Sequence, residues 1–474
     1  MKILYATSEA LPFAASGGLA DVAGSLPQAL RARLVGCRVV MPLYESVPQY
    51  LRDNMHFLVS LSVPVAWRRQ YCGVFEAKAN GVIYYLLDNQ YYFKRPGLYG
   101  HYDDAERFAF LSRAALEILK YIDFKPDILH ANDWQTALIP IYHSLFYCHD
   151  PLYRDMKTVF TIHNIQYQGK YGLEILEEVF GLPRDRQQIV EMDGCVNLMK
   201  GAIETAHRVT TVSPTYAAEL LDPYFSHGMD GILRARQWKL CGILNGIDTE
   251  SYDPGTDIQL RAHYSAEDMS GKAEDKKALQ EELGLPVRPD VPLLSMVSRL
   301  VSHKGLDLVK YALDQILQDD VQMVVLGSGD WVYENFFREA QARHGDKLRY
   351  CNGFIPDLAR RIYAGSDIFL MPSQSEPCGL SQMVACRYGA VPVVRETGGL
   401  KDSIRDCGDG EGNGFTFKTY NADDMLYAIR RAFGAYANKP DWAVISRHAM
   451  ESDFSWGRSA NEYLRLYREL LKSE

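Results

Sequence analysis

The stretch that decides the fold is Met1-Lys2-Ile3-Leu4-Tyr5-Ala6, followed after a short connection by Ser16-Gly17-Gly18-Leu19-Ala20-Asp21-Val22. The run from Ile3 to Ala6 is apolar without interruption, which is typical of a strand buried on both faces. Two glycines then open a helical pattern. A strand that passes through a glycine turn into a helix indicates a parallel, doubly wound α/β sheet.

The same alternation continues along the chain. Short β-branched runs predict strands at Ile3–Ala6, Arg38–Met41, Val82–Leu87, Asp127–His130, Thr158–Ile162, Val209–Val212, Leu293–Val297, Met323–Leu326, Ile368–Met371 and Val391–Val394. Helical patterns lie between many of them, such as Ala105–Tyr121 and Leu358–Ala364. We therefore expect parallel sheets with right-handed crossovers.

The second half restarts this pattern. Asp257–Pro292 is polar and is expected to be helical, and Leu293–Val297 then begins a new sheet. The mixed charges of Lys272–Lys277 are interpreted as a solvated helix face. Two doubly wound domains facing a cleft are the expected architecture, with ligands at the carboxyl ends of the strands.

Composition excludes several classes of protein. The 474 residues include 51 Lys plus Arg and 60 Asp plus Glu, a net charge of −9, which disfavours nucleic-acid binding by bulk charge. No apolar run is long enough to span a bilayer, and the first residues resemble neither a signal nor a transit peptide. Nine scattered cysteines without a C-x-x-C pair predict reduced thiols and a cytoplasmic location.

Glycine-rich turns are the first candidates for ligand binding. In Ser16–Val22 the backbone amides and the helix N-terminus could hold a phosphate, although a tight structural turn explains the glycines equally well. Gly327-Ser328-Gly329 follows another strand, but Val332 stands where a dinucleotide fingerprint has its third glycine. Binding of NAD is therefore weakly supported.

Polar residues at strand ends are the second group. His130-Ala131-Asn132-Asp133-Trp134 and Ile162-His163-Asn164 each end an apolar strand, where side chains face the ligand edge of a parallel sheet. Arg299 and Lys304 lie on one loop and could neutralise a diphosphate without a metal, although a basic loop at a helix start is the simpler explanation.

The third group is Glu376-Pro377-Cys378-Gly379-Leu380, followed by Arg395-Glu396-Thr397-Gly398-Gly399-Leu400. A carboxylate before a glycine that opens a helix could bind sugar hydroxyls while backbone amides bind phosphate. No D-x-D triplet occurs, so a divalent metal bridging a diphosphate lacks its usual ligands and no metal is expected.

These segments, in this order, resemble the bacterial glycogen synthase and plant starch synthase family. The motifs are Gly17–Val22, Ile243–Asp248, Glu376–Leu380 and Thr397–Leu400, and Phe454-Ser455-Trp456 through Tyr463 is similar to that family's C-terminal segment. The similarity runs from Met1 to about Tyr467.

The resemblance implies two Rossmann-like domains in the GT-B arrangement. The N-terminal, acceptor-side domain would be residues 1–243, the nucleotide-sugar domain residues 244–455, and residues 456–474 a helix that crosses back to the first domain. It also implies retaining transfer of glucose from ADP-glucose, as co-substrate, to the non-reducing end of an α-1,4-glucan such as glycogen, with no other cofactor.

Family roles carry over residue by residue where the motifs match. Arg299 and Lys304 would hold the diphosphate, Glu376 would contact the donor glucose, and His163 and Asp133 would orient it. Phe354 stands where relatives stack an aromatic ring on adenine. The remaining positions implied to bind nucleotide sugar are Ser16, Gly17, Gly18, Asp21, Asn164, Asn245, Cys378, Gly379, Leu380, Thr397 and Gly398.

One departure keeps alternatives open. The family usually has Lys-Thr-Gly-Gly in the first loop, whereas this chain has Ala15-Ser16-Gly17-Gly18. A charge-assisted contact of this type contributes ~1.5 to 3 kcal/mol. The alternatives are a related transferase that uses UDP-glucose and a weakly active, glucan-binding homologue. A glucan phosphorylase would need a pyridoxal phosphate lysine, for which we find no support. Tyr91-Tyr92-Phe93 is either a further glucan site or core packing.

Overall fold

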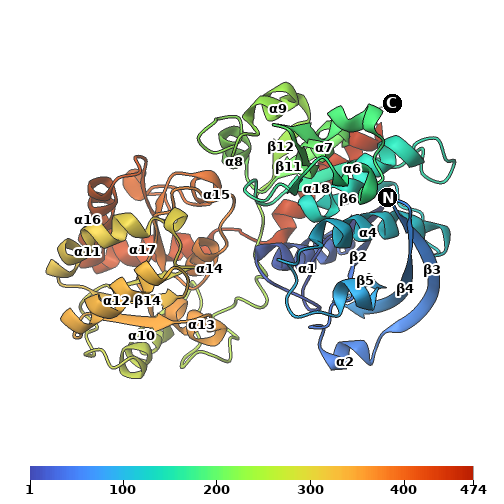
Figure 1. Ribbon diagram of the computed structural model, residues 1–474. Coiled ribbons are helices and arrows are strands. Elements are labelled where there is room, and N and C mark those ends of the chain that lie inside the picture. The colour runs from blue at the N-terminus through green and yellow to red at the C-terminus, as the bar shows by residue number, and fades with distance from the viewer. Residues whose placement is uncertain (473–474) are drawn as a thin grey trace. The chain divides into compact units, whose positions relative to one another are not determined.

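The chain divides into two compact units. The computed structural model describes residues 1–472 (Figure 1). Unit 1 comprises Met1–Ile243 and the segment that begins at Trp456, and unit 2 comprises Leu244–Ser455. Within residues 1–472, no helix has both the length and the hydropathy needed to cross a membrane.

Unit 1 is built on a nine-stranded sheet with the order β12-β11-β7-β6-β1-β2-β5-β4-β3. Its strands are β1 (Lys2–Ala6), β2 (Gly36–Pro42), β3 (His56–Val65), β4 (Arg68–Ala79), β5 (Val82–Asp88), β6 (Ile128–Asn132), β7 (Lys157–Ile162), β11 (Arg208–Thr211) and β12 (Leu240–Gly242). The strands from β12 to β5 pair in parallel. A small second sheet consists of β8 (Lys170–Tyr171), β9 (Glu191–Met192) and β10 (Cys195–Asn197).

The sheet of unit 1 departs from the expected parallel pattern at one edge. β3 and β4 pair antiparallel with each other, and β4 pairs antiparallel with β5. Only Ala66 and Trp67 connect β3 to β4, and Ala66 has a φ of 53°. A two-residue connection can join only antiparallel neighbours, so this hairpin extends the Rossmann-like core.

The helices of unit 1 pack against this sheet and each other. They are α1 (Gly18–Arg31), α2 (Gln49–Arg52), α3 (Gln90–Phe93), α4 (Asp104–Glu117), α5 (Leu138–Tyr142), α6 (Ile175–Glu178), α7 (Leu198–Thr205), α8 (Pro214–Glu219), α9 (Asp230–Ala235) and α18 (Trp456–Lys472). In α3, Tyr92 and Phe93 are buried whereas Tyr91 is exposed, so core packing explains two of these three aromatics.

The helix α18 completes unit 1 although it is distant in sequence. It packs on α1, and the guanidinium of Arg33, just after that helix, donates to the Gly457 carbonyl at 2.8 Å. Its buried Tyr467 hydroxyl lies 2.7 Å from Nδ1 of His130 on β6. The first sheet is therefore covered in part by residues from the far end of the chain.

Unit 2 contains a six-stranded parallel sheet with the order β15-β14-β13-β16-β17-β18. Its strands are β13 (Leu293–Val297), β14 (Gln322–Gly327), β15 (Leu348–Asn352), β16 (Ile368–Met371), β17 (Val391–Arg395) and β18 (Phe415–Phe417). Its helices are α10 (Ser270–Glu282), α11 (Leu306–Gln318), α12 (Trp331–Arg343), α13 (Pro356–Gly365), α14 (Ser381–Arg387), α15 (Gly398–Ser403), α16 (Ala422–Ala437) and α17 (Lys439–Glu451).

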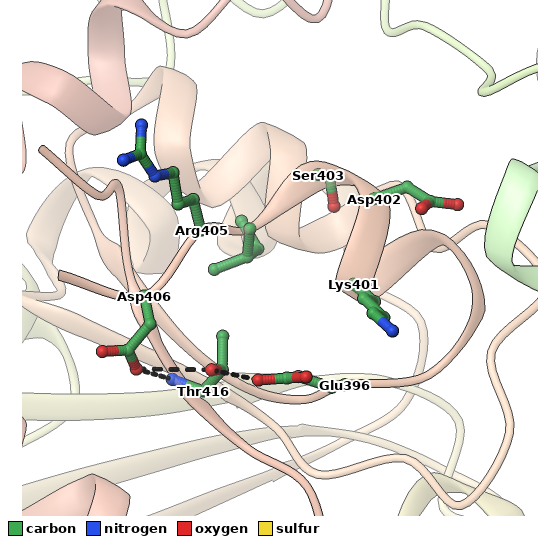
Figure 2. Close-up of a pocket in the computed structure, with 8 residues that line it drawn as sticks. Glu396, Lys401, Asp402, Ser403, Arg405, Asp406 and Thr416 are labelled. Carbon is green, nitrogen blue, oxygen red and sulfur yellow. Dashed lines mark hydrogen bonds between the residues drawn. The ribbon is translucent and has the colours of Figure 1, made fainter. Parts of the chain in front are cut away.

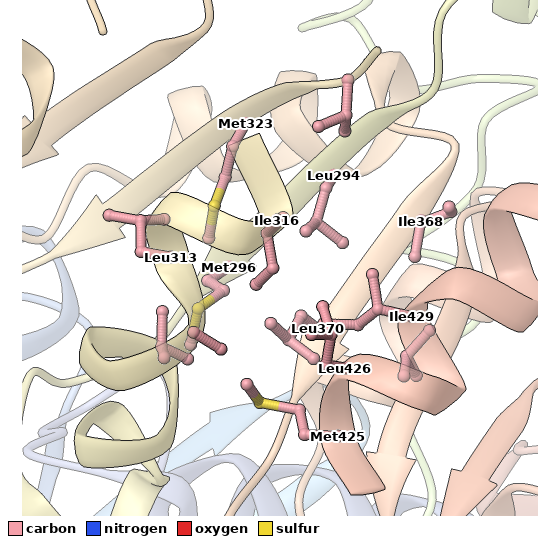
Figure 3. Packing of buried hydrophobic residues seen from close by; sticks show 14 of the residues in the cluster. Leu294, Met296, Leu313, Ile316, Met323, Ile368, Leu370, Met425, Leu426 and Ile429 are labelled. Atoms are coloured by element: carbon pink, nitrogen blue, oxygen red, sulfur yellow. The ribbon is translucent and has the colours of Figure 1, made fainter. Parts of the chain in front are cut away.

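Both faces of the second sheet are buried. On one face, Met323 and Val325 of β14 pack in a cluster with residues of α11 and α16 (Figure 3). On the other face, Val324 and Leu326 pack with residues of α10 and α13. Burial on both faces explains why the strand is apolar at consecutive positions, and the α/β fold expected from that pattern is confirmed.

The helix α10 corrects one interpretation of the sequence. Lys272, Asp275 and Lys276 are buried, so the segment is not simply a solvated face. The Nζ of Lys276 lies 2.7 Å from Oδ2 of Asp367, while that of Lys272 donates to the Ala364 carbonyl at 2.7 Å. These charged side chains are buried because they bond to partners in segments that are distant in the sequence.

Candidate active site

The first glycine loop of unit 1 is open to solvent. Residues 15–18 are exposed, and a Cβ atom added at Gly17 or Gly18 would have no atom within 4 Å. Helix α1 begins at Gly18, and no side chain caps its N-terminus. The loop is anchored below by the carboxylate of Glu9, which accepts a hydrogen bond from the Ser16 amide. Asp21 lies half-buried in the first turn of α1. This geometry leaves the helix N-terminus accessible to an anionic group.

The ends of β6 and β7 bring the predicted polar residues together. Asn132 pairs in register with Thr161, so the residues that follow the two strands lie side by side. The Asp133 carboxylate accepts hydrogen bonds from the amides of His163 at 2.7 Å and Asn164 at 3.4 Å.

The backbone at Asp133 is strained. Its φ of 56° and ψ of 179° lie in a region that is essentially limited to glycine. The Asp133 amide donates to the Thr161 carbonyl at 2.9 Å, which holds this conformation. Such strain costs about 1–3 kcal/mol and is concentrated at functional sites, so it supports a functional role for this position.

Burial shifts the pKa values of both side chains. It raises the pKa of Asp133 to about 7, against the lowering effect of hydrogen bonds from the His163 and Asn164 amides. It lowers the pKa of His163 to about 3. The imidazole is therefore neutral at physiological pH, while the Asp133 carboxyl titrates near neutrality.

Glu9 is a residue of this region that the sequence reasoning missed. It is 3 % exposed, and burial raises the pKa of its carboxyl. The charge of Glu9 also raises the pKa of Asp133, so the two acidic groups lie close enough to interact. The polar run Thr7-Ser8-Glu9 directly after the first strand was a signal that could have found it.

In unit 2, Lys304 and Glu376 form a buried ion pair. The Nζ of Lys304 lies 2.6 Å from Oε2 of Glu376, and the side chains are 14 % and 8 % exposed. Gly305 lets the segment that carries Lys304 pack closely on the segment that leads to Glu376. It has a φ of 76°, and a Cβ there would lie 2.1 Å from the Pro372 carbonyl oxygen. Ser373 donates from Oγ to the same Glu376 oxygen at 3.1 Å.

Two further glycines pack against the loop that carries Glu376. A Cβ at Gly398 would lie 1.9 Å from the Glu376 carbonyl oxygen, and one at Gly399 would lie 2.0 Å from that of Cys378. The Gly399 amide donates to the Glu376 carbonyl at 3.1 Å. The two predicted segments of this unit are therefore in direct backbone contact.

Gln382 fastens these segments together and was also missed. Its fully buried side chain donates to the Gly379 carbonyl at 2.9 Å and to Ser403 Oγ on α15 at 3.0 Å. No sequence signal distinguishes this glutamine from others on a helix.

Other predicted residues of unit 2 have different surroundings. Asn245 is buried, its backbone amide donates to the Cys378 sulfur, and its side-chain Oδ1 has no hydrogen-bond partner within residues 1–472. Burial raises the pKa of the Cys378 thiol to about 12, so this cysteine is protonated at neutral pH. Thr397 is buried just before α15, and Leu380 is half-buried just before α14.

Unlike the residues of unit 2 described above, Arg299 and Phe354 are exposed to solvent. The Arg299 side chain is exposed beside the 3-10 turn η6 (Ser302–Lys304), and Phe354 is 90 % exposed between β15 and α13. The glycines that resemble part of a dinucleotide motif serve packing instead. A Cβ at Gly327 would lie 1.9 Å from the Ser298 carbonyl oxygen.

A pocket of about 280 Å³ lies beside the end of α15 and the segment that follows it (Figure 2). Its lining includes Glu396, Lys401 and Asp406, and Thr416 Oγ1 donates to Glu396 at 2.8 Å. Neither Lys304 nor Glu376 lines it, so it is separate from their ion pair. Over residues 1–472, no group of three or more His, Cys, Asp or Glu side chains is arranged to hold a metal ion.

Comparisons with known proteins cover the whole chain. Residues 2–235 match the family described as starch synthase catalytic domain, and residues 278–439 match glycosyl transferases group 1. The chain is 50% identical to proteins named glycogen synthase from Geobacillus thermodenitrificans and Geobacillus stearothermophilus, over 100% of this chain and 99% of each relative.

Solved structures agree with these matches. The catalytic domain of starch synthase IV from Arabidopsis thaliana, bound to ADP and acarbose, superposes with a TM-score of 0.91 at 35% identity, covering 99% of both chains. A sucrose-phosphate synthase from Thermosynechococcus elongatus, 16% identical with a TM-score of 0.61, shares the fold. The chain therefore belongs to the glycogen synthase and starch synthase family of GT-B glycosyltransferases.

Proposed function

We propose that this protein transfers glucose from ADP-glucose to the non-reducing end of an α-1,4-glucan such as glycogen, with retention of configuration. The observation that carries the proposal is the full-length identity of 50% to glycogen synthases. The likeness to a starch synthase bound to ADP and acarbose, a nucleotide and a sugar-like ligand, supports the donor and acceptor classes.

The proposed chemistry separates charge at the donor. Breaking the bond between glucose and phosphate places negative charge on the departing diphosphate and oxocarbenium character on the sugar. Arg299 and Lys304, with the amides near Gly18 and Thr397, would stabilise the diphosphate. The absence of a metal requirement is part of the proposal.

The remaining roles concern the sugar and the base. Glu376, Asp133 and His163 would bind and orient the donor glucose, and Phe354 would stack on adenine. In the front-face mechanism expected for such retaining enzymes, the departing phosphate takes the proton of the acceptor hydroxyl. Unit 1 would serve the acceptor and unit 2 the nucleotide sugar, and the protein would act in the cytoplasm.

The remaining binding roles stay proposals as well. The amides of Gly17, Gly379 and Gly398 would approach phosphate or sugar closely. Ser16, Asp21, Asn164, Asn245, Cys378 and Leu380 would complete the binding of the nucleotide sugar.

A second candidate function is favoured by Ala15. Because the first loop lacks the usual lysine, donor preference could be shifted to UDP-glucose, or the protein could bind glucan with weak activity. The first alternative would incorporate glucose from UDP-glucose, and the second would incorporate little glucose from either donor.

The test is incorporation of labelled glucose into glycogen by the purified protein. ADP-glucose and UDP-glucose are compared in parallel, each with and without a chelator, and the anomeric configuration of the product is read by NMR. We expect incorporation from ADP-glucose that the chelator does not reduce. Incorporation from UDP-glucose alone would refute the donor assignment, and glycogen binding without incorporation from either would refute the transferase proposal.

A further inference from the structure

The buried side-chain amide of Asn132 contacts the His163 ring. Asn132 is the last residue of β6 and is fully buried. Its Nδ2 lies 3.0 Å from the carbonyl oxygen of Ala6. A carbonyl can only accept a hydrogen bond, so this contact fixes which end of the amide is nitrogen and which is oxygen.

The orientation of the amide determines the protons around it. Asn132 Oδ1 lies 2.9 Å from the Tyr5 hydroxyl and 2.9 Å from Nε2 of His163. Because Oδ1 has no hydrogen to give, both neighbours must donate to it. The hydrogen of a neutral His163 ring must therefore be on Nε2.

We propose that Asn132, supported by Tyr5, is a positioning residue that holds His163 as the Nε2–H tautomer and so leaves Nδ1 as a hydrogen-bond acceptor. An acceptor nitrogen suits the binding of a hydroxyl group, and because it carries no hydrogen it cannot act as a general acid. The proposal rests on the proposed function only in assigning that hydroxyl to a sugar substrate.

Packing alone does not explain an asparagine at this position. Ile128 and Ala131 of the same strand are buried apolar residues, and its other buried polar residue, His130, has its ring nitrogens bonded to Tyr467 and Thr161. Burying an amide is costly unless its polar atoms are bonded, and one of the bonds that satisfy Asn132 is to His163. Burial also lowers the pKa of His163 to about 3, which keeps the ring neutral, so that its tautomer has a defined meaning.

The decisive measurement uses the unmodified protein. Long-range ¹H–¹⁵N correlation spectra of the full chain labelled at histidine distinguish Nε2–H from Nδ1–H rings. The His163 signals are assigned by their loss in His163→Gln. We expect His163 to be an Nε2–H ring at pH 7. His143, whose Nε2 lies 3.0 Å from the Tyr153 carbonyl oxygen, serves as an internal reference for this tautomer. An Nδ1–H ring at His163 would overturn the proposal without any variant having to fold.

Variants then test the role of Asn132. Asn132→Ala should convert the His163 signals to a mixture of tautomers and lower kcat for glucosyl transfer ~10-fold or more, with a smaller change in KM. Tyr5→Phe should keep the tautomer and lower kcat less. The matched control is Tyr153→Phe, which removes another buried hydroxyl, bonded to the Leu116 carbonyl at 2.8 Å, and should change neither property.

The outcomes separate this inference from the proposed function. If no transfer activity exists, the tautomer of His163 in the unmodified protein still decides whether Asn132 positions it. If transfer occurs and Asn132→Ala leaves both tautomer and kcat unchanged, the inference fails and the proposed function stands.

Discussion

The ammonium of Lys304 lies 2.6 Å from the carboxylate of Glu376, with both side chains largely removed from solvent. The charge proposed to neutralise a diphosphate is thus already neutralised by an acid of the same unit. A diphosphate that approaches Lys304 must compete with Glu376 or share the lysine with it. Charge on Glu376 therefore opposes nucleotide binding even if its contact with the sugar assists transfer.

The first prediction concerns Glu376→Gln. Removing the negative charge should free Lys304 and tighten ADP binding ~10-fold, which corresponds to about 1.4 kcal/mol. The same change should lower kcat ~100-fold or more, because a contact to the reacting sugar is lost. Calorimetric titration with ADP and initial-rate kinetics measure the two effects. The control is Glu396→Gln, which removes another carboxylate of the same unit, one that accepts a hydrogen bond from Thr416. If both variants bind ADP as tightly as the unmodified protein does, the argument is contradicted.

The second prediction concerns the first loop. Position 15 is exposed, so a longer side chain fits there without displacing other atoms. Ala15→Lys should raise kcat/KM for ADP-glucose ~10-fold or more, since a charge-assisted contact contributes ~1.5 to 3 kcal/mol. Ala15→Met has a similar length without the charge and should give no gain. A gain of the same size from methionine would show that packing rather than charge is responsible.

The third prediction separates two glycines of unit 2. Gly398→Ala would place a methyl group 1.9 Å from the Glu376 carbonyl oxygen at a residue with a φ of 44°. We expect a loss of stability of about 3 kcal/mol and strongly reduced transfer. Gly434→Ala in α16 meets no atom within 4 Å and should instead stabilise the protein by about 0.5–1 kcal/mol. Thermal unfolding and transfer rates measured on both variants test this contrast.

The fourth prediction concerns pH. Burial raises the pKa of Asp133 to about 7, above its ordinary value of 3.8. The unfolded chain therefore releases this proton at lower pH than the folded chain, so the contribution of Asp133 to the stability of unit 1 should fall as pH rises from 4 to 7. Asp133→Asn removes this contribution. The melting temperature of the variant, relative to that of the unmodified protein, should therefore increase from pH 4 to pH 7. A constant difference across this range would place the pKa of Asp133 near its ordinary value.

Much of the fold could be predicted because parallel strands buried on both faces are apolar at consecutive positions. Leu293–Val297 and Ile368–Met371 are observed with the predicted bounds. The hairpin of β3 and β4 was not predicted. Its first strand is partly exposed and its second contains Arg68-Arg69-Gln70, so neither has the continuous apolar run that marked the others.

The candidate site was predictable only where chemistry follows a strand end. Asp133 and His163 lie beside each other because β6 and β7 are neighbours, which the sequence pattern favours. Gln382 binds Ser403, and Tyr5 binds Asn132, which is 127 residues away. Contacts of this kind depend on how distant segments pack, and no local pattern reports them.

The position of α18 in unit 1 has a consequence for the order of folding. During synthesis, residues 1–243 emerge first but lack the helix that packs on α1 and bonds to His130. Residues 244–455 are continuous and have all their sheet partners once they have emerged. The segment made later can thus reach its final form on the ribosome earlier, while the surface of α1 and β6 that α18 covers stays open until residues 456–472 are released. Chaperones that hold nascent chains would find their binding surface in the first half of this protein.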